Sequence, residues 1–225
     1  SRAPVALPYG APGETERAIA RNAAAFVPDG ATLEFGLGSL PDAVLAFLTT
    51  HKRLRVHSGA LGDGIVDLAK RGVIDQVVGG QIFGTQRFFD FADRNPLVQL
   101  RSSDYTHDPR VLFGIERFVA INSAVEVDLT GQVNAEIAGG SYVGAVGGAL
   151  DFIRAANQSP GGVSLIVIGF EFEYAKLSED DVEQLAGLQT YSGNVLVQTP
   201  TLMQLYATAG GGGYRETLGN REETH

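Results

Sequence analysis

The stretch LRVHSGALGDGIVDLAKRG at residues 54–72 decides the fold. Its first residues predict a short strand, and the glycines of HSGALGDG predict a turn after it. The segment GIVDLAKRG has apolar residues at helical spacing and closes on Gly72, directly after two basic residues. A strand that turns into a helix across a glycine loop forms the corner at which open α/β proteins bind ligands.

The same unit precedes this stretch. The segment at 14–27 has helical spacing, TLEFGLG at 32–38 is typical of a strand, and a helix is expected from Pro41 to Leu48, with proline in its first turn. Alternation of strands and helices at this spacing predicts an α/β fold. We expect an open, mainly parallel sheet flanked by helices, with right-handed crossovers.

The remaining chain is predicted to be more extended in its middle and helical near residue 150. Extended runs are expected at 77–84, 98–102 and 117–137, the last with a reversal at Thr130-Gly131. A glycine-rich loop at 139–148 is followed by a helix at 149–156, a buried strand at 163–170, a helix at 177–188 and a strand at 194–199. We therefore predict an extended segment or linker at 1–13, one domain at 14–208 and a glycine-rich, polar tail at 209–225.

Composition excludes several classes of function. With 225 residues and 44% hydrophobic content the chain can bury a sizeable core, and its net charge of −9 argues against nucleic acid and anionic membranes as partners. The chain has no cysteine, which excludes disulfides, thiolate metal sites and a cysteine nucleophile. No apolar run reaches the roughly 18 residues needed to span a bilayer. We expect a cytoplasmic protein without a metal, since its histidines lie in no metal-ligand spacing.

Three glycine loops carry the candidate chemistry. Gly36 and Gly38 separate a strand from a helix, so exposed amides there are able to face a phosphate or a carbonyl. The alternative is a tight turn whose glycines only relieve steric crowding. HSGALGDG is the second loop. In the third, Gly147 and Gly148 precede a helix and offer backbone donors to a thioester oxygen. Three such loops at strand ends suggest one shared cleft.

Four segments together resemble a known family. The chain is similar to the acetyl-CoA hydrolase/transferase family, of the class I CoA-transferase type, and specifically to its carboxy-terminal domain. The resemblance covers roughly residues 14–168, and it implies a CoA-transferase-like open α/β domain that shares its active-site cleft with a second such domain. The segments that carry it are DGATLEFGLGSLPDAVLAFL at 29–48, LRVHSGALGDGIVDLAKRGVI at 54–74, INSAVEVDLTGQVNAE at 121–136 and VGGALDFIRAANQSPGG at 146–162.

The resemblance also implies site residues and a reaction. Family members move CoA between carboxylic acids, or release it to water, through a glutamyl-CoA thioester that requires a nucleophilic carboxylate. Here Gly59 follows His57-Ser58, where the family has that glutamate. The chain also differs from the family pattern at 169–177 and 197–206. The implied CoA-contacting residues are Gly36, Leu37, Gly38, Ser39 and Leu40, with Gly144, Gly147 and Gly148 beside the thioester.

The remaining polar candidates each have two interpretations. His57 is a candidate general base or substrate-orienting residue, or a structural hydrogen-bonder at a strand end. Asn122 and Glu126, spaced for one face of an extended run, are candidates for facing the cleft, against a solvated sheet face. Asp63 is expected to cap the following helix, with a substitute nucleophile as the alternative.

Together these observations predict a CoA-thioester-binding protein of hydrolase or transferase type. It would bind coenzyme A or acyl-CoA without a covalent cofactor, and would have lost the glutamyl-CoA route. It would act with a protein partner that supplies the first domain, or as a homo-oligomer. Two alternatives remain: a non-catalytic structural or ligand-binding subunit, and a non-transferase reaction on a CoA ester, such as ring opening or hydration.

Overall fold

The structure is a computed structural model. It describes residues 12–128, 130–142, 144, 147–175, 188–198, 204–208 and 213–216. From residue 169 onward, only the backbone of these segments is described. Its helices are α1 (Glu14–Ala24), α2 (Ser39–Ala46), α3 (Gly64–Lys70), α4 (Gln86–Ala92), α5 (Ser103–Thr106), α6 (Pro109–Leu112) and α7 (Ala149–Gln158). Its strands are β1 (Thr32–Phe35), β2 (Leu54–Leu61), β3 (Ile74–Ile82), β4 (Val98–Leu100), β5 (Phe118–Ser123), β6 (Glu126–Val127), β7 (Val133–Asn134), β8 (Ile137–Ala138), β9 (Ser141–Tyr142), β10 (Val163–Ala175), β11 (Leu188–Gln198), β12 (Gln204–Thr208) and β13 (Gly213–Glu216).

The strands form one large sheet whose order reverses in its middle. Six parallel strands run in the order β10-β5-β1-β2-β3-β4, and β11, β12 and β13 extend the sheet antiparallel beyond β10. The chain builds outward from β1 to β4 and then returns to place β5 on the other side of β1. The open, mainly parallel sheet predicted from the sequence is confirmed. Its topological switch point, where such folds bind ligands, lies between β1 and β5.

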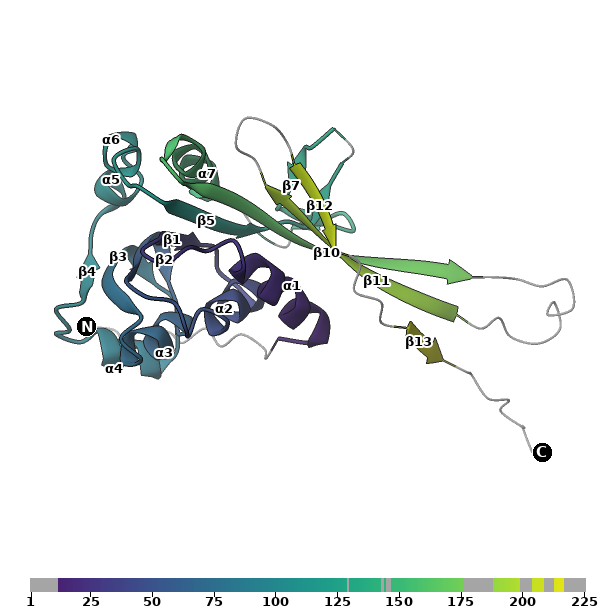
Figure 1. The fold of residues 1–225 in the computed structure, drawn as a ribbon, viewed down its shortest axis with the longest axis horizontal. Coiled ribbons are helices and arrows are strands. Elements are labelled where there is room, and N and C mark those ends of the chain that lie inside the picture. The colour runs from purple at the N-terminus through teal and green to yellow at the C-terminus, as the bar shows by residue number, and fades with distance from the viewer. Residues whose placement is uncertain are drawn as a thin grey trace, which may run out of the picture.

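Helices cover both faces of the sheet (Figure 1). Alternation along the strands explains the two layers, because neighbouring residues point to opposite faces. Leu33, Val119 and Ile121 belong to the larger core, which they share with buried residues of α1, α2, α3 and α4. Phe118 and Ala120 belong to a smaller core with residues of α6 and α7.

The local predictions hold best in the first third of the chain. The helices and strands expected between residues 14 and 72 are all present, and α2 begins two residues before Pro41 because Gly38 takes the position before the first helical turn. The three short helices α4, α5 and α6 were not predicted. The reversal at Thr130-Gly131 is confirmed as the turn between β6 and β7. Most of the helix predicted at 177–188 falls outside the described residues.

Within the described part of the chain, no helix combines the length and the apolar character required to cross a membrane.

Candidate functional site

A buried carboxyl and a buried amide meet at the switch point of the sheet. Glu34 of β1 is only 3% exposed and Asn122 of β5 only 8%. The Asn122 side-chain amide donates a hydrogen bond of 2.9 Å to Glu34 Oε2. Burial raises the pKa of Glu34 to about 8, although the amide bond acts in the opposite direction. Glu34 is therefore largely a neutral acid near neutral pH.

The first glycine loop lies directly above this pair. Gly36 donates its amide to the Ile121 carbonyl of β5, and a Cβ added to Gly36 would lie 3.4 Å from Asn122 Oδ1. Gly38 has φ +138° and precedes α2, a conformation that favours glycine. Leu37 is 41% exposed, and Ser39 and Leu40 form the start of α2. The predicted CoA-contacting residues thus lie at the carboxyl edge of the sheet.

His57 lies on the same sheet face, beneath α5. It is 5% exposed, and its Nε2–H donates to the Thr106 carbonyl at 3.0 Å. Its ring also approaches the rings of Tyr105 and Phe118, with centroids 6.0 and 6.4 Å away. Burial lowers the pKa of His57; the Thr106 bond opposes this shift, and nearby His107 adds to it. A neutral imidazole thus ties β2 to the end of α5.

The imidazole of His107 fills the space between two glycines far apart in the sequence. A Cβ added to Gly59 would lie 3.1 Å from His107 Nε2, and one added to Gly148 would lie 2.3 Å from the same atom. The ring also packs on Phe152 of α7, with the centroids 4.8 Å apart. The position at which the sequence predicts a missing glutamate is thus covered by a histidine ring.

The third glycine loop divides between two places. Gly148 is the residue before α7 and lies against His107. Gly147, which directly precedes Gly148, has φ +54°. Gly144 donates its amide to the Glu136 carbonyl at 3.3 Å, beside the β8–β9 hairpin. The described residues bring Gly148 next to Gly59 through His107.

Two carboxylates meet at the start of α2 and α3. Asp63 precedes α3 but makes no side-chain bond to its first turn, so the predicted cap is wrong. Its two oxygens instead accept from the Thr85 amide at 2.8 Å and the Thr85 hydroxyl at 3.0 Å. Burial, together with the charge of Asp63, raises the pKa of Asp42 to about 6. Because both oxygens of Asp63 accept hydrogen bonds from Thr85, Asp63 holds the loop that precedes α4.

Asn122 and Glu126 do not lie on one strand, which corrects the expected spacing. β5 ends at Ser123, and the chain then leaves the large sheet because Val125 donates its amide to the Asn134 carbonyl of β7. Glu126 begins the separate β6–β7 pair, where its exposed carboxylate accepts from the Asn134 side chain at 3.4 Å. The structure thus brings Asn122 to Glu34 rather than to Glu126.

Glu34, Thr106 and His107 were not predicted from the sequence as site residues. Glu34 is an isolated acid inside an apolar strand, TLEF, and that pattern was a usable signal. Thr106 and His107 carry no comparable signal, because their location depends on the excursion of the chain through β4 and α5.

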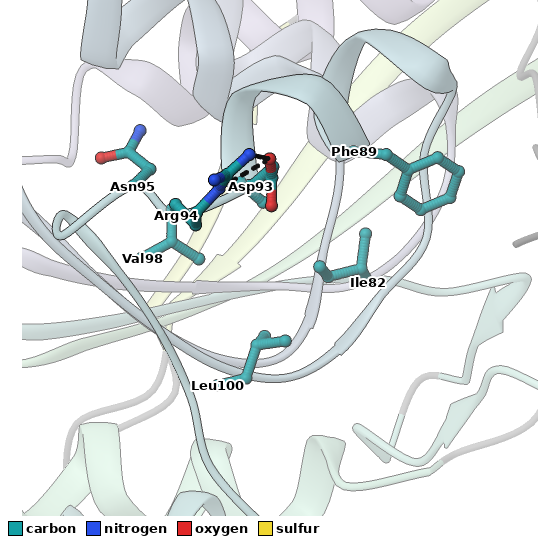
Figure 2. Close-up of a pocket in the computed structure, with 8 residues that line it drawn as sticks. Ile82, Phe89, Asp93, Arg94, Asn95, Val98 and Leu100 are labelled. Carbon is teal, nitrogen blue, oxygen red and sulfur yellow. Dashed lines mark hydrogen bonds and ion pairs between the residues drawn. The ribbon is translucent and has the colours of Figure 1, made fainter. Parts of the chain in front are cut away.

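An apolar pocket lies at the β4 edge of the sheet (Figure 2). The exposed Arg94–Asp93 ion pair lies at its side, with the closest atoms 3.2 Å apart. None of the predicted site residues lines it, and no group of three or more potential metal ligands occurs among the described residues. The apolar side chains that line the pocket are Ile82, Phe89, Ala92, Val98 and Leu100.

Comparison with known proteins identifies the fold and its family. Residues 84–179 match the acetyl-CoA hydrolase/transferase C-terminal domain. The 4-hydroxybutyrate coenzyme A transferase of Clostridium kluyveri is 43% identical over 165 residues, which cover 69% of this chain and 38% of that protein. The chain belongs to the acetyl-CoA hydrolase/transferase family.

Solved structures agree with this membership. RipA from Yersinia pestis superposes with a TM-score of 0.66 at 32% identity, covering 72% of this chain and 38% of RipA. The 4-hydroxybutyrate CoA-transferase from Porphyromonas gingivalis superposes with a TM-score of 0.60 at 35% identity, covering 70% of this chain and 40% of that one. This chain therefore spans about two fifths of the length of these two proteins.

Proposed function

We propose that this chain binds a CoA thioester at the carboxyl edge of its sheet and processes it without a glutamyl-CoA intermediate. Family membership supports the ligand class, because relatives include enzymes named CoA transferases and acetyl-CoA hydrolases. The predicted binding surface is the loop from Gly36 to Leu40 together with the residues that lead into α7.

The observation that carries the proposal is the surroundings of Gly59. A glycine cannot form a thioester, and a substitute would need a reachable carboxylate. Glu34 is buried and bonded to Asn122, Asp63 is bonded to Thr85, and Glu126 lies on the β6–β7 pair. Among the described residues, the side chains that a Cβ at Gly59 would meet are the imidazole of His107 and, slightly farther away, the ring of Phe152, and neither is a carboxylate.

We further propose that the family's first domain completes the cleft, as a partner subunit or as another part of the same polypeptide. The supporting fact is length, since the chain spans 38% of its 4-hydroxybutyrate CoA-transferase relative. A second copy of the chain is the alternative occupant of that side of the cleft.

Calorimetric titration of the full chain with CoA and acetyl-CoA tests ligand binding. Leu37→Glu adds a negative charge to the first glycine loop and should weaken binding of the anionic ligand about tenfold. Leu100→Glu is the matched control, because Leu100 is exposed but lies at the β4 edge. If wild-type chain binds neither ligand, with or without the first domain, the proposal is wrong.

Chemical trapping tests the absence of the glutamyl intermediate. Incubation with acyl-CoA and either borohydride or hydroxylamine should leave this chain unmodified. A CoA-dependent modification of a carboxylate in this chain would contradict the proposal.

A non-catalytic ligand-binding subunit is the second candidate function. Gly59 favours it directly, because the family's covalent step has no side chain there. Binding of acyl-CoA without release of free CoA, in the presence of the first domain, would select this candidate over the enzyme.

A further inference from the structure

His107 presents one ring nitrogen toward the predicted thioester position. Its Nε2 lies near the backbone of both Gly59 and Gly148, close enough that a Cβ at either residue would fall within 3.1 Å of it. Gly59 and His107 are both partly exposed, so the site is reachable from solvent. Within the described part of the chain, no side chain or backbone group hydrogen-bonds this nitrogen.

The other ring nitrogen is held by Thr106. The Thr106 hydroxyl lies 2.9 Å from His107 Nδ1 and 3.4 Å from the Ser102 carbonyl. A carbonyl only accepts and a hydroxyl has one hydrogen, so both contacts form when Thr106 donates to Ser102 and accepts from Nδ1–H. In the neutral imidazole this arrangement selects the tautomer with its hydrogen on Nδ1, which leaves Nε2 as the nitrogen that can accept a proton.

Two further contacts fix the position of the ring. His57 donates to the Thr106 carbonyl and so anchors the end of α5 to β2. Phe152 packs against the imidazole from α7. The base is therefore oriented by a hydroxyl, a second histidine and an aromatic ring, which is the arrangement a general base requires.

We propose that His107 is the general base of a direct, water-dependent hydrolysis of the CoA thioester, an inference that rests on the proposed function. Nε2 takes a proton from water as the water oxygen bonds to the thioester carbonyl carbon. The tetrahedral intermediate then collapses, the carbon–sulfur bond breaks, and the CoA thiolate takes the proton from the imidazolium. Acyl-CoA and one water give one carboxylic acid and one CoA thiol.

The two glycines acquire a role under this proposal. A side chain at position 148 would overlap the ring, and one at position 59 would press on it. Glycine at both positions therefore leaves room for the His107 imidazole beside position 59, where the family resemblance places a carboxylate.

Thiol release is the primary test, with the full chain assayed together with the domain that completes the cleft. The chain contains no cysteine, so it adds no thiol background to the assay. His107→Gln should lower the rate of CoA release from acetyl-, butyryl- or succinyl-CoA by about 10²- to 10⁴-fold. His51→Gln is the matched control, because His51 bonds the Val27 carbonyl away from the glycine loops, and it should retain the wild-type rate.

Titration calorimetry on the same variants separates this inference from the proposed function. His107→Gln should bind CoA within about threefold of wild type. If the wild-type chain itself does not bind CoA, the proposed function is wrong. Normal binding with no CoA release from any of these thioesters, or with equal release by wild type and His107→Gln, would overturn the role of His107 alone.

Two readouts exclude a purely structural role. Imidazole added to His107→Ala should restore part of the rate, and Thr106→Val should slow release whereas Thr106→Ser should not.

In oxygen-18 water, a single turnover should label the released acid, because its new oxygen comes from water. An unlabelled first-turnover acid would indicate transfer from an enzyme carboxylate and would overturn the proposal.

Discussion

Strand β1 presents two different chemistries on its two sides. Leu33 and Phe35 point into the larger core beneath α1–α4, whereas the alternating residues Thr32 and Glu34 point to the face covered by α5–α7. The same division continues on β5, where Ile121 is apolar and the next residue is Asn122. One face is thus built for burial, and the other accepts buried polar groups at its carboxyl edge. Substitutions on the apolar face should therefore change stability, and substitutions on the polar face should change the chemistry of the site.

The largest effect is expected on the apolar face. Leu33 is fully buried, so Leu33→Ala should lower the free energy of unfolding by about 2–5 kcal/mol through lost transfer energy and a cavity. Urea denaturation measures this change. Leu100→Ala is the control, since Leu100 is 55% exposed, and it should change stability by less than about 0.5 kcal/mol. If Leu33→Ala and Leu100→Ala lowered the free energy of unfolding equally, the assignment of the core to the apolar face would be wrong.

On the polar face, Glu34 should make stability depend on pH. Its pKa rises from an ordinary 4.5 to about 8 on folding, so the folded chain retains a proton that the unfolded chain loses. Its stabilising contribution is complete below pH 4.5 and is lost as the pH rises through 8. Glu34→Gln keeps a neutral partner for Asn122 and should be more stable than wild type by about 3 kcal/mol at pH 7, with a larger difference at alkaline pH.

Thermal melts of wild type and Glu34→Gln across this pH range check the expectation. The difference between them should grow as the pH rises and should be small in acid. Glu126→Gln is the matched control on an exposed strand, and its melting curve should follow wild type at each pH. Parallel curves for wild type and Glu34→Gln would mean that Glu34 does not hold its proton in the folded chain.

A smaller effect is expected from coupling Gly59 to His107. Gly59→Glu alone should destabilise the chain by about 1–3 kcal/mol, because its Cβ would lie 3.1 Å from His107 Nε2. The double variant Gly59→Glu with His107→Ala should recover about 0.5–3 kcal/mol of that loss. We expect hydroxylamine-sensitive glutamyl-CoA from the double variant and not from Gly59→Glu alone. Gly114→Glu, where the nearest atom to an added Cβ is 3.5 Å away, is the steric control.

The smallest effect concerns the loop that follows β3. Thr85 accepts from the Arg87 amide at the start of α4 and donates to Asp63. Thr85→Ala should cost about 1 kcal/mol in chemical denaturation. Thr85→Ser keeps both hydroxyl contacts and should match wild type. A loss as large as that of Leu33→Ala would show that this loop supports the core as strongly as the apolar face does.

Local patterns predict the units of this fold but not their order. The strand, glycine loop and helix at 54–72 follow from residues close in sequence, and β2 and α3 confirm them. The pairing of β1 with β5 instead joins segments separated by three other strands. No local pattern encodes that choice, so the sequence predicts parallel strands without locating the switch point.

The candidate site divides in the same way. The glycine loops were visible because a turn at a strand end requires glycine locally. The expected partnership of Asn122 with Glu126 failed because β5 ends at Ser123 and the chain changes direction. His107 was passed over because only the docking of α5 on β2 brings it to Gly59. Periodicity identifies which face a residue points to, whereas the partner it meets is set by tertiary topology.

The switch point also sets an order of events in time. The Glu34–Asn122 contact spans 88 residues, and the His57–Thr106 contact spans 49. Contacts of such separation close large loops, which slows their formation relative to helices and neighbouring strands. We expect a refolding chain to regain its helical signal first and its ability to bind ligand last. Newly made chains would then pass through a stage that is compact but functionally silent.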